Sequence, residues 1–278
     1  MSEQHSIPAG SPVWIDYTAG DFARQQEFYT ALFGWTFEDQ GEDYGHYRMI
    51  RAGRATVGGA MDGEVAAQFS GGEVAPAAWT VYLRTDDLAE TLRRVGEHGG
   101  TVEVDAMPVG SLGTMAEVRT PGGERVGFWQ PDEFAGHDLP LTPGTAVWFE
   151  VMSTDFAADA EFYRAVCGWD VVPMGASGQP AGDDGAAGGA GDGPGYATNH
   201  AMDLATAGLC DARPWLPEGQ AGYWRVYFQT ADMDASVRVI QEQGGRVVDG
   251  PMDSPFGVVA TVVDPAGATF QLNQPPAS

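Results

Sequence analysis

The sequence predicts an α+β fold made of four βαβββ units, and an internal repeat is the strongest evidence for it. About half of the positions in residues 13–35 are identical in residues 147–169, at a spacing of about 134 residues, which indicates a duplicated domain. Each copy has the pattern of a strand, an amphipathic helix that ends at glycine, and a further strand. A second strand–helix pattern, at residues 79–98 and 224–243, follows within each copy.

In the first half, the elements follow from alternating strand patterns, helix caps and glycine stops. A strand at residues 13–17 leads into a helix that Asp21 is expected to cap and that Gly34 ends. Residues 62–77 are polar and are expected to form a loop. The other predicted elements are a helix at 87–98 and strands at 35–37, 44–51, 55–61, 79–83, 102–107, 115–119 and 126–130.

The second half repeats this order after a linker that contains Pro and Gly, at residues 132–144. We therefore expect two domains, at 10–131 and 145–275. Residues 175–195 consist almost entirely of Gly, Ala, Asp, Ser and Pro, so they have few side chains to bury and are expected to form a disordered insertion. The predicted elements are helices at 155–166 and 233–243 and strands at 147–151, 224–228, 247–250, 258–263 and 269–273.

The charge balance excludes several classes of partner. The chain has 39 acidic and 14 basic residues, a formal net charge of −25, which repels nucleic acid and anionic membranes. No apolar run is long enough to span a membrane, and the polar N-terminus is unlike a signal peptide. We therefore expect a cytoplasmic protein without nucleic-acid or membrane partners; whether it is a monomer or a homodimer is left open.

The four opening strands have two different faces, because side chains alternate along a strand. One face is almost wholly apolar and should lie beneath the helices. The other face mixes aromatic and polar side chains, which suits neither a dry core nor a solvated surface and is typical of a ligand cleft. Its residues are Trp14, Asp16, Thr18, Thr80, Tyr82, Arg84, Trp148, Glu150, Met152, Arg225, Tyr227 and Gln229.

The repeated motifs resemble the vicinal oxygen chelate superfamily, which includes glyoxalase I, bleomycin-resistance proteins and extradiol dioxygenases. The resemblance rests on the paired βαβββ units, on the Asp-Phe, Glu-Phe-Tyr and Gly-Trp elements of residues 21–35, and on the turns at 120–123 and 264–267. It implies two glyoxalase-like domains, each with a curved mixed sheet around a cleft. The tandem arrangement is similar to two-domain glyoxalase-like proteins of actinobacteria.

The resemblance also implies where metal ligands stand in members that use a metal: on the opening and closing strands of both units of a cleft. A divalent cation there needs about three His or carboxylate donors, and neither half supplies them. We therefore expect no metal and no cofactor. The corresponding residues are Trp14, Gly59, Thr80 and Gly127 in the first half and Trp148, His200, Arg225 and Gln271 in the second.

The resulting hypothesis is metal-independent binding of a planar hydrophobic small molecule, of antibiotic or aromatic polyketide type, for sequestration, resistance or delivery to a tailoring enzyme. Alternatives are an enzyme, glyoxalase- or dioxygenase-like or metal-free, that acts on an aromatic or carbonyl substrate in the same cleft, and a scaffold with closed clefts. Whether the first unit pairs with the second or the fourth is left open. The expected ligand-binding residues are Trp14, Asp16, Thr80, Tyr82, Trp129, Trp148, Glu150, His200, Arg225, Tyr227 and Gln271.

Five of these residues also have a purely structural interpretation. Trp14 and Trp148 could pack between units instead of stacking on a ligand. Asp16 and Glu150 could form ion pairs within the sheet, and His200 could be a hydrogen-bonded structural residue. The sequence does not separate these alternatives.

Overall fold

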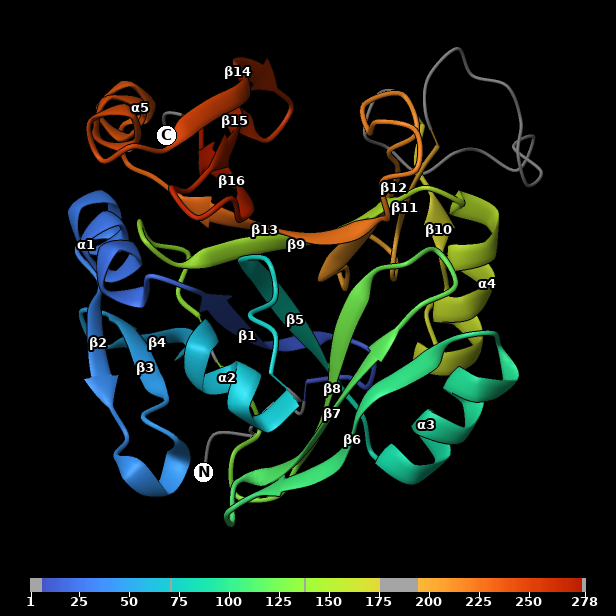
Figure 1. Ribbon diagram of the computed structural model, residues 1–278. Helices are drawn as coiled ribbons and strands as arrows, with labels where there is room; N and C mark the ends of the chain where they lie inside the picture. Colours follow the sequence, from blue (N-terminus) through green and yellow to red (C-terminus); the bar gives the residue numbers. More distant parts are fainter. Residues whose placement is uncertain (1–6, 71, 138, 176–194, 277–278) are drawn as a thin grey trace, which may run out of the picture. The chain divides into compact units, whose positions relative to one another are not determined.

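The computed structural model describes residues 7–70, 72–137, 139–175 and 195–276 and confirms an α+β fold of four βαβββ units (Figure 1). Most of the predicted insertion at 175–195 lies outside the described residues. The first unit comprises β1 (Pro12–Ala19), α1 (Phe22–Phe33), β2 (Thr36–Asp39), β3 (Arg48–Ala52) and β4 (Ala55–Asp62). The second comprises β5 (Ala78–Arg84), α3 (Leu88–Glu97), β6 (Thr101–Val109), β7 (Gly113–Arg119) and β8 (Arg125–Pro131).

The second half repeats the same order of elements. The third unit comprises β9 (Ala146–Ser153), α4 (Phe156–Cys167), β10 (Val172–Pro173), β11 (Tyr196–Thr198) and β12 (Ala207–Asp211). The fourth comprises β13 (Tyr223–Gln229), α5 (Met233–Glu242), β14 (Arg246–Ser254), β15 (Gly257–Val263) and β16 (Thr269–Gln274).

The strands form two mixed eight-stranded sheets, one from each half of the sequence. Their orders are β2-β3-β4-β1-β5-β8-β7-β6 and β10-β11-β12-β9-β13-β16-β15-β14. Within each βαβββ unit the opening strand pairs in parallel with the closing strand, as β1 does with β4 and β13 with β16. Among the described residues, no helix is both long enough and apolar enough to cross a membrane.

The chain forms two compact lobes, and these do not coincide with its two sequence halves. The first lobe contains the described residues up to Val13, Val81–Gly136 and Phe149–Trp224, and the second lobe contains Trp14–Thr80, His137–Trp148 and Arg225 onward. In the first lobe α3 packs against α4, and in the second α1 packs against α5 (Figure 1). By this packing the first βαβββ unit associates with the fourth and the second with the third, a question that the sequence left open.

The second lobe has a core of large aromatic rings beneath α1 and α5. The ring of Tyr29, from the buried face of α1, stacks on Trp35 with centroids 5.2 Å apart. Trp79 and Phe228, from the apolar faces of the opening strands, lie 5.1 Å apart by ring centroids, and Phe270 lies 5.8 Å from Phe228. All five side chains are at most 5% exposed, so the predicted division of the strand faces holds here.

The helix ends follow the predicted chemistry, with one exception. Gly34 and Gly168 end α1 and α4 in the left-handed conformation, with φ of 69° and 71°. The Asp232 side chain caps α5 by accepting a hydrogen bond from the Ala235 N–H at 2.8 Å, and α3 and α4 are capped in the same way. The prediction that Asp21 caps α1 is wrong: its φ is 48° and its side chain makes no capping bond.

Two predicted boundaries in the first unit are also wrong. The loop expected at 62–77 contains a helix, α2 (Gly63–Ser70), which begins where the Asp62 carboxylate accepts the Glu64 N–H at 2.8 Å. The strand expected at 44–51 starts only at Arg48. A short 3₁₀ helix (Glu42–Tyr44) precedes it, and Gly45 then takes a left-handed φ of 60°, which interrupts an extended chain.

Two carboxyl groups are buried together in the first lobe. The side chains of Glu124, after the turn before β8, and Asp159, on α4, are completely buried, and both lie within 2.8 Å of the point that a Cβ on Gly122 would occupy. Thr120 donates to Glu124, and Ser153 donates to Asp159 at 2.5 Å. Burial, and then the charge of Asp159, raises the pKa of Glu124 to about 8, so the pair holds a proton at neutral pH.

The second lobe places a different acid at the corresponding turn. Asp264 is 2% exposed, and it accepts hydrogen bonds from the Tyr17 and Tyr29 hydroxyls at 2.5 and 3.0 Å. Its other carboxylate oxygen accepts the backbone N–H groups of residues 266–268. Burial, followed by the charge of Asp264, raises the pKa of Tyr29 well above its ordinary value. This carboxylate is fully satisfied, whereas Glu124 and Asp159 must share a proton.

Candidate functional site

The candidate residues on β1 form a hydrogen-bonded cluster in the second lobe. The Trp14 indole N–H donates to Asp16 Oδ1 at 2.8 Å and lies 2.9 Å from the Tyr47 hydroxyl, which itself donates to Asp16. Trp14 is 9% exposed, and His137 lies against its ring with centroids 6.2 Å apart. The pKa of Tyr47 is raised well above its usual value, first by burial of its hydroxyl and second by the negative charge of Asp16. Tyr47 therefore stays protonated and fixes the orientation of Trp14 and Asp16.

Glycine at position 59 makes this cluster possible. Gly59 on β4 is the parallel partner of Asp16, and a Cβ there would lie 1.6 Å from the Tyr47 hydroxyl oxygen and 2.7 Å from Asp16 Oδ1. A glycine within a strand marks close approach by another group, and here that group is a tyrosine hydroxyl. Gly59 stands where the resemblance implies a metal ligand, and the Tyr47 hydroxyl occupies the space that a side chain at this position would need.

The first lobe has two further strand glycines that are covered by a tyrosine side chain. Gly127 on β8 pairs with Tyr82, whose ring lies 2.2 Å from where a Cβ on Gly127 would be. Gly208 on β12 pairs with Glu150, and the Tyr196 hydroxyl lies 2.2 Å from the equivalent point on Gly208. At three closing strands, a tyrosine covers a glycine where metal-using relatives would carry a side-chain donor.

The first-lobe candidates are mostly buried and held by polar contacts. The Tyr82 hydroxyl donates to Glu117 Oε1 at 2.7 Å, and Tyr82 is 3% exposed. Trp129 is 7% exposed, and its indole N–H donates to the Phe134 carbonyl at 2.8 Å. Glu150 is 4% exposed. These contacts hold the aromatic rings in fixed orientations on the sheet.

The remaining candidates lie in the second lobe. The Arg225 guanidinium donates to the Tyr227 hydroxyl at 2.9 Å and lies 5.2 Å from the centre of its ring. Gln271, the parallel partner of Tyr227, accepts a hydrogen bond from the Thr261 hydroxyl at 2.7 Å. Thr80 is 9% exposed, and Trp148 is half-buried.

His200 does not occupy the strand position expected for it. It lies in the bend between β11 and β12, where its Nδ1 contacts Asp170 Oδ2 at 2.9 Å. The residue of the third unit that corresponds to Gly59 is Gly208. Gly208 pairs with Glu150 in the sheet, just as Gly59 pairs with Asp16. Residues 199–202 resemble residues 58–61 in sequence, which predicted that His200 corresponds to Gly59. The strand pairing does not have this register.

The structure thus brings together Trp14 with Asp16 and Arg225 with Tyr227, and it places Gln271 beside Tyr227 in register. It also adds Tyr47, Tyr196 and Glu117, which the sequence did not single out. The sequence does contain one signal for such contacts, namely the glycines at positions 59 and 127 within predicted strands. A glycine within a strand indicates that a neighbouring group approaches closely.

The residues present do not fit a divalent cation. The opening positions carry indole, hydroxyl or guanidinium groups, and three of the closing positions are glycines covered by tyrosine. Across the described part of the chain, no group of three His, Cys, Asp or Glu side chains comes close enough to hold a metal. The two sets of strand positions therefore carry rings and hydroxyls and lack a donor set for a cation.

Comparison with known families identifies the class of protein. Residues 11–128 match the family described as the Glyoxalase/Bleomycin resistance protein/Dioxygenase superfamily, and residues 147–273 match a Glyoxalase-like domain. The chain belongs to this superfamily, which confirms the resemblance drawn from its motifs.

Relatives extend over nearly the whole chain. It is 31% identical over 280 residues to a protein of Mycobacterium tuberculosis named putative glyoxylase CFP32, covering 99% of this chain and 98% of the relative. It is 31% identical over 277 residues to the anthracycline biosynthesis protein DauV of Streptomyces sp. (strain C5), covering 95% and 92%.

Solved structures share the fold. The Mn(II)-bound glyoxalase of Novosphingobium aromaticivorans has a TM-score of 0.60 at 14% identity, covering 96% of this chain and 82% of that chain. The 2,3-dioxygenase LapB of Pseudomonas sp. KL28 has a TM-score of 0.63 at 11% identity, covering 98% and 94%. At these identities the likeness concerns the fold alone.

Proposed function

We propose that this protein binds a planar, hydrophobic aromatic molecule of polyketide or antibiotic type without a metal ion, and thereby sequesters it, confers resistance to it or delivers it to a tailoring enzyme. The observation that carries the proposal is the Trp14–Asp16–Tyr47 cluster. Where the resemblance implies a metal ligand, the cluster holds an indole ring, with the carboxylate of Asp16 beside it. An indole held by its own N–H keeps its ring plane fixed, so stacking on it costs little conformational entropy.

Two further features support this proposal. Trp148, Arg225 and Tyr227 add half-buried aromatic and cationic groups to the second lobe, which suit a ligand with flat rings and phenolate or carboxylate oxygens. The relative DauV is named an anthracycline biosynthesis protein. The proposal is that this chain takes a ligand of the same chemical class.

The test is a fluorescence and calorimetric titration with a fused tetracyclic quinone, compared with a saturated hydrocarbon analogue of similar size. We expect the planar compound to bind and the saturated one to bind much more weakly. Trp14→Leu and Trp148→Leu should each weaken binding about tenfold or more, since stacking and apolar contact area are lost. Trp215→Leu is the matched control, because Trp215 is 56% exposed on a loop.

A chelator provides the second part of the test. Treatment with EDTA should leave the affinity for the planar compound unchanged. Loss of binding after chelation, with recovery on adding a divalent metal, would show a metal-dependent site and contradict the proposal. Equal effects of the Trp14, Trp148 and Trp215 variants would remove the site assignment. Turnover of the quinone by the purified chain would favour the alternative of a metal-free enzyme.

A further inference from the structure

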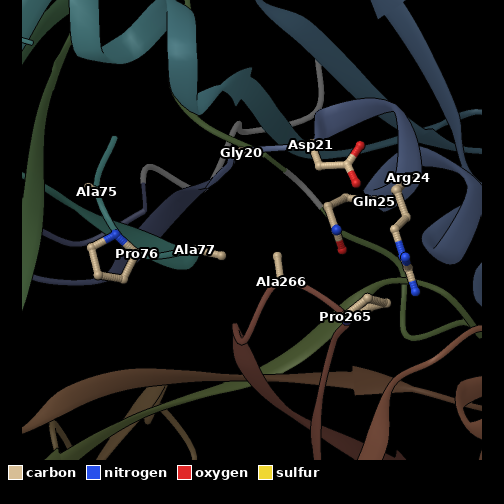
Figure 2. A pocket seen from close by; sticks show the side chains of 9 residues that line it. All are labelled: Gly20, Asp21, Arg24, Gln25, Ala75, Pro76, Ala77, Pro265 and Ala266. Carbon is tan, nitrogen blue, oxygen red and sulfur yellow. The ribbon is translucent and has the colours of Figure 1, made fainter. Parts of the chain in front are cut away.

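A pocket lies in the second lobe, at the N-terminus of α1. Its volume is about 390 Å³, and it opens between the start of α1, the segment at residues 75–77 and the turn at residues 265–266 (Figure 2). Asp21, Arg24 and Gln25 supply its polar groups, and Pro76, Pro265 and Ala266 supply apolar walls. The polar groups are concentrated on one side, that of the helix.

Gln25 contributes a buried polar side chain to the wall of this pocket. Its side chain is 2% exposed, and among the described residues no group donates to its Oε1. Figure 2 shows the amide directed into the pocket, toward the turn that carries Pro265 and Ala266. Leaving a buried carbonyl oxygen without a hydrogen bond is unfavourable, so a donor from a ligand would be favoured there.

The internal repeat explains why this partner is missing. The position of Gln25 on α1 corresponds to Asp159 on α4, where Glu124 faces the carboxyl group. The residue that corresponds to Glu124 is Ala268, which has no polar side chain. The second lobe therefore keeps the buried polar group of the helix and lacks the side chain that would meet it.

The start of α1 is also arranged differently from those of α3, α4 and α5. Asp87, Asp155 and Asp232 each cap their helix with a side-chain oxygen, whereas Asp21 does not. Asp21 instead takes a left-handed φ of 48°, which is unfavourable for a residue with a side chain and tends to be retained at binding sites. The positive end of α1 is left without a side-chain cap, beside the exposed guanidinium of Arg24.

We propose that this pocket binds a small zwitterion with an amino group next to a carboxylate, such as a free α-amino acid. The ligand's carboxylate lies at the uncapped N-terminus of α1 and at Arg24. Its ammonium group donates to Gln25 Oε1 and to the Asp21 carboxylate. A zwitterion suits the site better than a simple anion, because the chain carries a net charge of −25 and repels anions at long range.

The experiment is calorimetric and NMR titration of the full chain with L-alanine, alongside acetate and methylammonium, which each carry only one of the two charged groups. We expect alanine to bind with a Kd in the millimolar range or below, and both comparison compounds to bind about tenfold more weakly or worse. Acetate that binds as tightly as alanine, or no binding of alanine at about 10 mM, would overturn the proposal.

Variants locate the binding. Arg24→Ala and Gln25→Leu should each weaken alanine binding about tenfold or more. Arg238→Ala is the matched control on α5, at another exposed helix position, and should leave binding unchanged. Because Gln25 is buried, thermal melting must first show that Gln25→Leu folds, whereas Arg24 is exposed and its variant tests the site independently. If the Arg24 and Arg238 variants bind alanine equally well, the ligand does not lie in this pocket.

Discussion

Replacing Glu124 with glutamine should stabilise the protein, and the gain should grow as the pH rises. In the folded chain Glu124 is completely buried against Asp159, and its pKa is raised to about 8 by burial first and by the Asp159 charge second. In the unfolded chain the same group has an ordinary pKa near 4.5. Glutamine keeps the shape and an acceptor for the Thr120 hydroxyl, and its amide donates to the Asp159 carboxylate without carrying a charge.

The sign follows from proton binding in the two states. Below a pH of about 4.5 the group is protonated whether the chain is folded or unfolded, so it contributes nothing. Between about 4.5 and about 8 the unfolded chain releases the proton and the folded chain retains it, so stability falls as the pH rises. At about 1.4 kcal/mol per pH unit, the loss is of the order of 5 kcal/mol when the pH reaches about 8.

The assay is urea denaturation of the wild type and Glu124→Gln at several values between about pH 5 and pH 8, followed by tryptophan fluorescence. We expect the two proteins to be similar near pH 5 and the variant to be more stable by several kcal/mol near pH 8. Glu161→Gln is the matched control, because Glu161 is an exposed carboxylate on the same helix as Asp159. A difference between wild type and Glu124→Gln that stays constant or shrinks as the pH rises would refute the reasoning.

Two further changes test the packing of the strands and the helix caps. Gly59→Ala should cost about 1–3 kcal/mol of unfolding free energy, because its Cβ would lie 1.6 Å from the Tyr47 hydroxyl. The cost should largely vanish in a Tyr47→Ala background, and additive effects in this double-mutant cycle would contradict the proposed contact. Asp232→Ala should cost about 1 kcal/mol through loss of the 2.8 Å cap to Ala235, measured by thermal melting. Gln241→Ala, at an exposed position near the end of α5, is its control, and an equal loss there would argue against the cap.

The sequence by itself determined the repeated fold and the faces of its strands. Strand alternation separated apolar residues such as Val81 and Val226, which are completely buried, from the polar and aromatic positions. Glycine and aspartate located the ends of most helices, because capping depends on residues adjacent in sequence. These features are local, so a single chain reveals them without knowledge of how distant segments meet.

The tertiary structure decided what surrounds each of those positions. Tyr47 reaches Asp16 across 31 residues of sequence, and Tyr196 covers Gly208 only because β11 and β12 pair in one register. The packing of α1 on α5 and the proton-sharing pair Glu124 and Asp159 are likewise products of segments far apart in the chain. The reason is physical: side-chain contacts depend on strand register and helix packing, and neither is encoded in local periodicity.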